Sequence, residues 1–266
     1  MTGPESTPGP SLPGFPAPAG FPAPPLPAFP GGTAVSALKV YDWEAADGLC
    51  GGSPHLHTVS SEAYLVTGGS GRVQTLSMTG AAEHDLSPGS LLWFSPGTVH
   101  RLVNTDSLAL NVIMSNAGLP EAGDAVLTFP PHVLADPELY AANATLPGRE
   151  EGEDVVAAAA RRRRDLALEG YAELREAMAV EGPSSLARFH QAAAALVRPK
   201  VAKWRGIWED KVRADVEATA RALDALEHGS AETLSGAAVA RAHPRPGPAG
   251  YGMCGRLSTW QPPLPA

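Results

Sequence analysis

The chain has 266 residues, of which 44% are hydrophobic, 27 are Pro and 28 are Gly, and its formal net charge is −8. This length allows one large domain or two small ones, and residues 1–130, with ten acidic and three basic side chains, lack the clustered Lys and Arg of a nucleic-acid surface. No apolar run is long enough for a membrane span, the two cysteines give no disulfide framework, and no basic segment precedes an apolar core near the start, so we expect a cytoplasmic protein.

The first 32 residues form a Pro/Gly/Ala-rich tail, in which Gly-Phe-Pro-Ala-Pro occurs at 14–18 and again at 20–24. Proline this dense excludes helices and sheet ladders, so the sequence predicts a disordered or polyproline II tail. Its phenylalanines are either anchors for a partner's groove or part of a solvated segment without a task.

Short strand-like runs follow, rich in small and β-branched residues and separated by Gly, Pro, Asn and Asp. We expect Gly68–Gly71 to turn the chain and Glu83–Asp85 to form a polar turn that holds a solvated His84. Many short strands with regular turn signals predict a sandwich or barrel, with strands at 33–40, 62–67, 71–78, 90–95, 98–104 and 108–114.

Histidines at two places in these runs are spaced for metal binding. On a strand His55 and His57 project to one face, and Glu62 can reach the same cavity if the chain bends. Pro96-Gly97 suits the centre of a type II turn that delivers His100 into the next strand. Three imidazoles and one carboxylate would suit a divalent metal such as Fe, Mn, Ni or Zn. The alternative is that these histidines lie on the surface of an ordinary β-domain.

The same segments resemble the cupin family, a small β-barrel of jelly-roll type. The first cupin motif is H-x-H, four residues, Glu, six residues, Gly, and the second ends in Gly, two residues, His, three residues, Asn. The matching residues are His55, His57, Glu62 and Gly69 in the first motif and Gly97, His100 and Asn104 in the second. The resemblance implies that His55, His57, Glu62 and His100 are metal ligands.

Two positions depart from the cupin pattern, and both concern turns. Leu49 replaces a Gly expected six residues before the first His, and Ser95 occupies the usual Pro position of the second motif. Tyr64 shares the face of Glu62, and Asn104 that of His100, so both are predicted to contact substrate. Tyr64 could instead pack in the core with its hydroxyl satisfied. Arg101 has the opposite parity to His100 and is expected to face solvent.

From about residue 131 the hydrophobic period becomes helical, with candidates at 132–142 and 154–180. Ser184 is expected to cap a further helix, which Pro199 either kinks or follows with a new start, and the helical pattern continues to Gly229. We expect the run of four arginines at 161–164 to be a solvated charged face, and Trp204 and Trp208 to pack in a helix interface.

These patterns predict an α+β protein. Its expected divisions are a disordered tail (1–32), a cupin barrel (33–130), a helical region (131–241), and a linker with a returning strand (242–266). The last segment either adds an edge strand to the barrel or covers the helices. The helices are expected to dock on the barrel or on a second subunit, so a homodimer is one predicted assembly.

Cupin membership implies both enzymes and binders, because fold does not fix function. The first hypothesis is a metal-dependent oxygenase or isomerase that acts on a small polar metabolite. The alternative is a non-catalytic protein that binds or senses a small, sugar-like ligand. Both hypotheses predict a small-molecule ligand as partner, and neither involves nucleic acid or a membrane.

Overall fold

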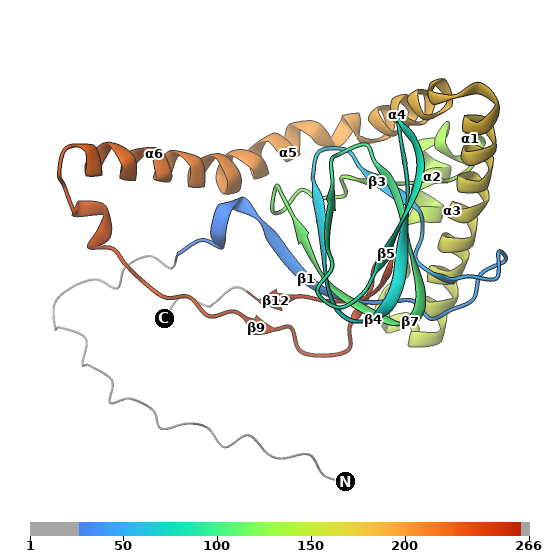
Figure 1. Ribbon diagram of the computed structural model, residues 1–266, viewed down its shortest axis with the longest axis horizontal. Coiled ribbons are helices and arrows are strands. Elements are labelled where there is room, and N and C mark those ends of the chain that lie inside the picture. The colour runs from blue at the N-terminus through green and yellow to red at the C-terminus, as the bar shows by residue number, and fades with distance from the viewer. Residues whose placement is uncertain (1–26, 262–266) are drawn as a thin grey trace, which may run out of the picture.

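The computed structural model describes residues 27–261, in which a β-barrel is followed by helices (Figure 1). The α+β class and the barrel predicted from the sequence are confirmed. The barrel strands are β1 (Ala34–Val40), β2 (Cys50–Gly51), β3 (His55–His57), β4 (Glu62–Ser77), β5 (Gly80–Leu86), β6 (Leu91–Phe94), β7 (Val99–Met114) and β8 (Ala125–Leu127). Of the tail predicted at 1–32, residues 1–26 lie outside the described part, and Pro30–Gly32 form the short 3-10 turn η1.

Two long bent strands, β4 and β7, form the body of the barrel. They pair antiparallel from Glu62 opposite Met114 to Leu76 opposite Val99, with register shifts near Gly68 and Ser70. The turn expected at Gly68–Gly71 is therefore wrong, because these glycines bend one strand instead of ending it. A Cβ on Gly69 would lie 2.2 Å from a backbone carbonyl oxygen of β7, so only glycine allows this close approach.

The segment expected to form a polar turn at Glu83–Asp85 belongs instead to strand β5, which pairs with β4. Most of β5 is exposed, so the alternation of apolar and polar residues that marks a half-buried strand is missing from its sequence. His84 is exposed on this strand, as expected, and lies away from the other histidines of the barrel.

The molecule has two apolar cores, one inside the barrel and one between the barrel and the helices. The inner core contains Leu38, Tyr64, Val66, Val73, Leu102, Leu110 and Val112. The outer core joins the outward-facing residues Leu56, Val99, Val126 and Phe129 of the barrel to Tyr171, Leu186 and Phe189 of the helices. One face of the barrel wall is therefore covered by helices and not by water.

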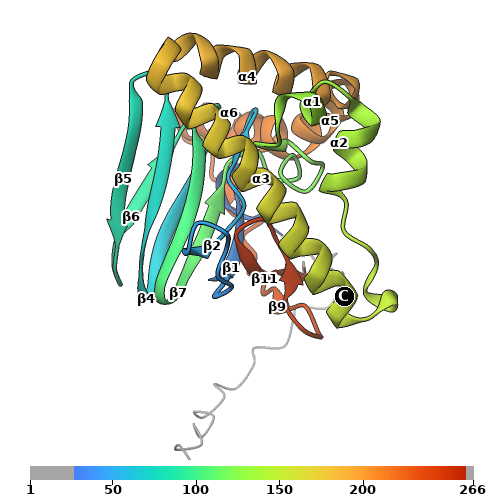
Figure 2. The ribbon, with the colours of Figure 1, turned by 90° about the vertical axis from the view of Figure 1, so that its right-hand side faces the viewer.

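The helices run along and beyond the barrel (Figures 1 and 2). They are α1 (Pro131–Leu134), α2 (Pro137–Ala144), α3 (Glu153–Glu181), α4 (Pro183–Val197), α5 (Val201–Trp208) and α6 (Ala214–Glu227), with short turns η2 (Arg149–Glu151), η3 (Arg198–Lys200), the π-helical turn η4 (Glu209–Arg213) and η5 (Glu232–Leu234). Among the described helices, none is both long and apolar enough to cross a bilayer.

The predicted long helix at 154–180 is confirmed as α3, but the predicted cap of the next helix is wrong. The N-cap of α4 is Gly182, which has no capping side chain, while the Ser184 hydroxyl donates back to the Glu181 carbonyl. Pro183 occupies the first helical position, where its ring fixes φ at a helical value. The N–H that proline lacks would have no partner within the helix at this position. Pro199 lies in η3, which separates α4 from α5.

Only half of the arginine run at 161–164 is the solvated face that we expected: Arg161 and Arg162 are exposed, whereas Arg163 and Arg164 are buried. Arg164 is 2% exposed and donates to the backbone carbonyls of Trp43 and Glu44, and Arg163 donates to Gly252 O at 2.6 Å. Arg161 stacks over the Trp43 ring at 4.2 Å. Helix α3 crosses the barrel (Figure 2), so one side of the run meets loop carbonyls that need donors.

The C-terminal segment returns to the barrel as an edge strand, which settles the alternative left open by the sequence. Its strands are β9 (His243–Pro244), β10 (Gly250–Tyr251), β11 (Gly255–Ser258) and β12 (Trp260–Gln261), and β11 pairs antiparallel with β1. Before β11 the chain packs so closely on the barrel that a Cβ on Gly52 would lie 2.5 Å from the Cys254 Cα atom.

Candidate metal centre

Three strands of the barrel bring the predicted ligands together. His55 and His57 lie on β3, Glu62 begins β4, and His55 lies opposite His100 in the antiparallel pair of β3 and β7. Gly97 has a φ of 85° and Thr98 N donates to Ser95 O, so the predicted turn delivers His100 into β7. The alternation of strand side chains points both β3 histidines to the barrel interior and sends Leu56 to the helices.

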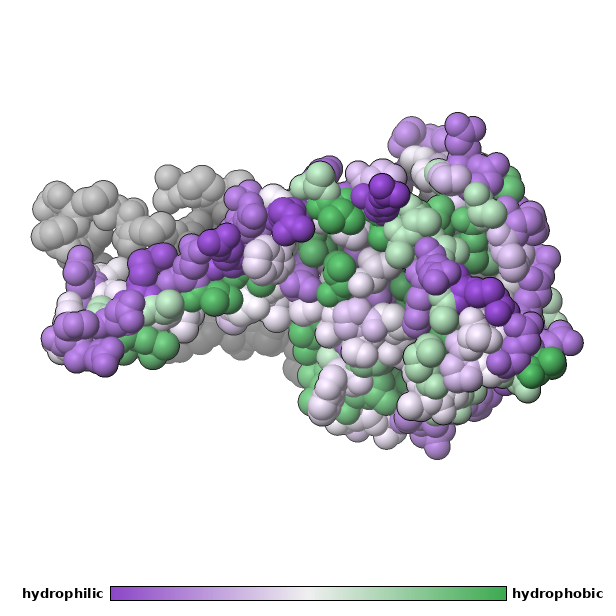
Figure 3. Space-filling view, turned by 90° about the horizontal axis from the view of Figure 1, so that it is seen from above, coloured by the Kyte–Doolittle hydropathy of each residue, from purple (hydrophilic) through white to green (hydrophobic). Residues whose placement is uncertain are grey.

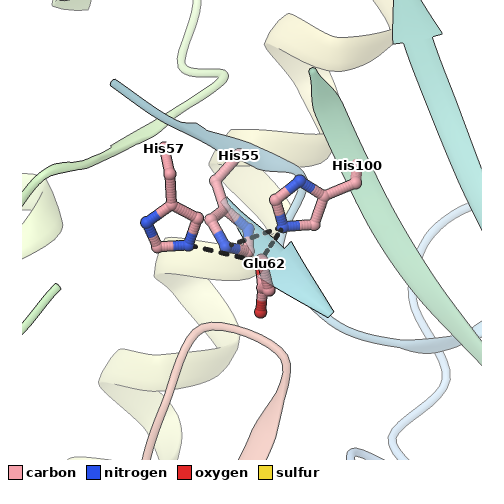
Figure 4. Close-up of side chains that lie close together, drawn as sticks. All are labelled: His55, His57, Glu62 and His100. Atoms are coloured by element: carbon pink, nitrogen blue, oxygen red, sulfur yellow. Dashed lines mark hydrogen bonds and ion pairs between the residues drawn. The ribbon is translucent and has the colours of Figure 1, made fainter. Parts of the chain in front are cut away.

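The four side chains converge on one point inside the barrel (Figure 4). One ligand atom from each residue lies within 4.8 Å of all the others. Oε2 of Glu62 is 3.0 Å from His100 Nε2 and 3.3 Å from His57 Nε2, and the Nε2 atoms of His55 and His100 are 3.2 Å apart. The exposed fractions of the residues are 0–9%, so bulk water does not separate them.

Hydrogen bonds at the opposite ring nitrogens orient all three imidazoles. Nδ1 of His55 lies 2.9 Å from Ser53 O, Nδ1 of His100 lies 3.1 Å from Thr98 O, and Nδ1 of His57 lies 2.7 Å from a carboxylate oxygen. Since these partners only accept, each Nδ1 carries the proton. In a neutral imidazole this leaves the Nε2 lone pair free, and all three Nε2 atoms face the cluster.

These donors fit a divalent metal ion. Two Nε2 lone pairs at 3.2 Å repel each other unless a cation or a proton lies between them. Oε2 of Glu62 is buried without a well-formed hydrogen bond, although two ring nitrogens approach it. Ligands about 2.1 Å from one centre are ~3.0–3.4 Å apart in octahedral or tetrahedral geometry, and the measured separations fall in that range.

The buried charges shift the pKa values of the cluster in opposite directions. Burial, together with the neighbouring His100 and His57, holds the pKa of His55 well below its usual value, which favours the neutral ring. Burial also lowers the pKa of His57, but its hydrogen bonds to Asp124 and Glu62 outweigh this and raise the pKa to about 10, so a bound metal ion would have to displace the Nε2 proton that His57 directs at Glu62. Burial raises the pKa of Glu62, and the adjacent histidines more than reverse this, so its pKa lies well below the usual value.

Asp124, which the sequence analysis missed, is the residue that orients His57. It is fully buried, its Oδ1 accepts from His57 Nδ1, and its Oδ2 accepts from the backbone N–H of Ser60 at 3.1 Å. A carboxylate behind a ligating imidazole fixes the ring and makes it a better ligand. No spacing rule links residues 57 and 124. The only local signal was a lone Asp after Gly123 and before an apolar run.

The two predicted substrate contacts occupy different environments. Tyr64 is fully buried inside the barrel, and its hydroxyl has no hydrogen-bond partner among the described residues. Asn104 instead holds backbone: its amide donates to Val40 O and Tyr41 O, and its carbonyl accepts from Leu108 N. The substrate contact of Asn104 stays a prediction, and its present contacts are structural.

Arg101, expected to face solvent because its parity is opposite to that of His100, is only 2% exposed. It points away from the cluster as predicted, but helices cover that side of the barrel. Its guanidinium pairs with the Asp47 carboxylate, with N–O distances of 2.5 and 3.2 Å. The direction was correct and the exposure was wrong.

The comparison with known families finds the cupin domain, matched over residues 43–115. Similar solved structures include a Pac13 variant from Streptomyces with uridine (18% identity, 36% of this chain and 67% of that chain, TM-score 0.28) and KdgF from Halomonas sp. (19%, 34% and 73%, 0.27). A cupin protein from Bacteroides fragilis is also similar (18%, 32% and 65%, 0.24). No curated protein sequence matches this chain significantly.

Proposed function

Because residues 43–115 of this chain form a cupin domain, we propose that His55, His57, Glu62 and His100 hold one divalent ion of Fe, Mn, Ni or Zn. One observation carries the proposal: each imidazole donates its Nδ1 proton outward, so that three Nε2 atoms meet a buried carboxylate. We further propose that the protein acts on a small polar metabolite as an oxygenase or isomerase. The ion would supply Lewis acidity, or electron transfer to dioxygen if it is redox-active.

The residues around the cluster restrict the size of the substrate and offer it one hydrogen-bond donor. The Phe94 ring lies 4.3 Å from the His100 ring and in edge contact with the Tyr64 ring, so an apolar wall closes this side. Burial, and then the charges of Glu62 and Cys254, hold the pKa of Tyr64 well above its usual value. Its free hydroxyl therefore stays protonated and donates a hydrogen bond, and it does not serve as a base.

The alternative function, non-catalytic binding of a small sugar-like ligand, is favoured by the same surroundings. Burial raises the pKa of the Cys254 thiol, so this group stays neutral as Tyr64 does. Among the described residues, the other titratable groups next to the four proposed ligands are Asp124 and the neutral side chains of Tyr64 and Cys254. The Asp124 carboxylate is already engaged by His57 and Ser60. An isomerase needs a base to move a proton, whereas a binder does not.

Metal analysis of protein purified without a histidine tag tests the proposed site. Wild type should bind about one equivalent of a divalent metal, and a His57→Ala/His100→Ala variant should lose most of it, because a methyl group cannot replace an imidazole ligand. A His84→Ala/His228→Ala variant removes two exposed histidines and should retain the metal. Full metal content in the first variant would refute the ligand assignment.

A second measurement separates the two functions once metal binding is established. A thermal-shift screen of small polar metabolites identifies a ligand, since binding to the native state raises the melting temperature. Incubation of that ligand with the metal-loaded protein, followed by mass spectrometry, then shows whether it is converted. Conversion that is lost in His57→Ala/His100→Ala supports the enzyme, and tight binding without conversion supports the binder.

A further inference from the structure

Helix α6 projects beyond the barrel at the end of a long arm, residues 201–227, made of α5, η4 and α6 (Figure 1). The first half of the arm is anchored: Trp204 is buried and its indole N–H donates to Ala122 O. The last hydrogen bond described between the arm and a distant part of the chain is at Asp215, whose carboxylate accepts from Gly32 N. Helix α6 itself buries no residue.

Large apolar side chains are exposed on one face along the whole arm. Their exposed fractions are 41% for Val201, 38% for Trp208, 64% for Val216 and 63% for Leu223. The intervals are seven, eight and seven residues, and the π turn η4 accommodates the extra residue, so all four lie on one face. We call this face the arm stripe, and Leu226 extends it at 53% exposure.

The arm stripe has the chemistry of a surface that needs a partner. An isolated helix of about 14 residues is marginal in water, and most of its stability in a protein comes from packing an apolar face. Seen from above, the arm carries hydrophilic side chains along one edge and apolar ones along the other (Figure 3). An apolar stripe at this spacing packs against another helix with the same spacing.

The charges along the arm indicate which helix that is. Residues 198–213 carry six Lys or Arg and two Asp or Glu, all exposed, whereas residues 214–232 carry one Arg and five Asp or Glu. Two copies side by side in the same direction would place like charges together. Two antiparallel copies place the basic half of each against the acidic half of the other, which is the arrangement that a two-fold axis produces.

We propose that the arm is a dimerisation element, which packs antiparallel against the arm of a second copy of this chain. A two-fold axis near the π turn brings Val201 and Trp208 against the partner's Leu223 and the partner's Val216. Arg198 and Arg205 lie three residues before and four after Val201, so they flank the stripe at its basic end. In this register Arg198 faces position 226 of the partner, between the partner's Asp224 and the partner's Glu227, and Arg205 faces position 219, close to the partner's Glu217.

Sedimentation equilibrium of the full chain tests the proposal, with wild type expected to be a dimer at micromolar concentration. The variant Val216→Glu/Leu223→Glu should raise the dimer dissociation constant by at least about 30-fold, the factor that corresponds to loss of one hot-spot residue. Both positions are exposed, so circular dichroism should show an unchanged fold. The control Val180→Glu/Val239→Glu places charge at two positions that are 81% and 92% exposed and lie outside the arm, and it should dimerise normally.

Charge reversal tests the antiparallel orientation. Arg198→Glu/Arg205→Glu changes residues 198–213 from six basic and two acidic side chains to four of each, which removes the positive charge of this half and should weaken the dimer. Adding Asp224→Lys/Glu227→Lys to the same chain reverses the charges that face position 198 of the partner and should restore dimerisation at least in part, whereas in a parallel dimer each of these positions faces its own copy and gains no attraction. A monomeric wild type, a dimer that Val216→Glu/Leu223→Glu leaves intact, or a monomer that dimerises only after removal of residues 1–26 would each overturn the proposal.

Discussion

Replacing Asp124 by Asn is the sharpest test of how the candidate metal centre is built, because it changes no proposed ligand. Asp124 accepts two hydrogen bonds, one from His57 Nδ1 at 2.7 Å and one from Ser60 N at 3.1 Å. An amide has one accepting oxygen and one donating nitrogen. If the oxygen keeps Ser60, the amide N–H₂ faces His57 and forces its Nδ1 to accept. The ring proton then moves to Nε2, where it blocks coordination.

The size of the effect follows from this exchange of tautomers. Loss of a hydrogen-bond partner behind a ligating histidine costs 10–100-fold in metal affinity, which is about 1.4–2.7 kcal/mol. If the amide takes the opposite orientation, a buried Ser60 N–H loses its acceptor, at a cost of about 1–3 kcal/mol in folding stability. Either orientation therefore weakens the metal-bound state of Asp124→Asn.

Competition with a chromophoric chelator measures the metal affinity directly, and chemical denaturation of the metal-free protein measures stability. Asp106→Asn is the matched control, because it removes the same charge from an exposed position on β7, remote from the cluster. We expect weaker metal binding in Asp124→Asn and wild-type binding in Asp106→Asn. A folded Asp124→Asn variant with both wild-type metal affinity and wild-type stability would refute the argument that Asp124 fixes the His57 ring.

Three further predictions concern the fold. Gly170→Ala should destabilise the protein by about 1–3 kcal/mol, because the new Cβ would lie 2.2 Å from a carbonyl oxygen at the barrel. Gly206→Ala has open space around its Cβ and should raise the free energy of unfolding by up to about 1 kcal/mol. Urea unfolding measures both changes. Arg164→Ala should lower the unfolding free energy by about 1–3 kcal/mol, since two loop carbonyls lose their donors, and an unchanged urea midpoint would contradict this. Burial raises the pKa of the Asp47 carboxyl, but the Arg101 guanidinium more than reverses this, so the folded-state pKa is lowered. The Asp47–Arg101 pair therefore stabilises the fold at pH values above the unfolded-state pKa of about 3.9. This contribution is lost as the pH falls through the lowered folded-state pKa. Asp47→Asn should thus cost up to about 1 kcal/mol at pH 7, because the carboxylate is half-exposed, and nothing in strong acid; a difference from wild type that persists there would refute the linkage.

The proposed metal ligands could be found in the sequence because strand parity and turn chemistry are local. His55 and His57 are two apart on one strand, and Pro96-Gly97 fixes the turn before His100. Asp124 could not be found in this way, because its place beside His57 depends on the pairing of β3 with β8, more than 60 residues apart. The role of the glycines in β4 also depends on a distant strand, because a glycine bend and a glycine turn have the same local signal.

The errors about solvent exposure share one physical cause, which is the layer of helices on the barrel. Strand parity predicts only whether a side chain points into the barrel or out of it. An outward side chain is exposed to solvent only where no other element covers the barrel wall. Arg101 points outward into such a covered surface, and Arg163 and Arg164 approach the same region from α3. All three bury a guanidinium and direct its N–H groups at carbonyl or carboxylate oxygens, since a buried charge is tolerated only when it is paired. Beyond Asp215 no such layer covers the arm within the described part of the chain, and the large apolar side chains Val216, Leu223 and Leu226 are exposed there among charged ones. The presence of a covering layer therefore explains why the arginines are buried between the barrel and the helices of the same chain. The lack of one over the arm stripe is the reason that we propose a second chain as its partner.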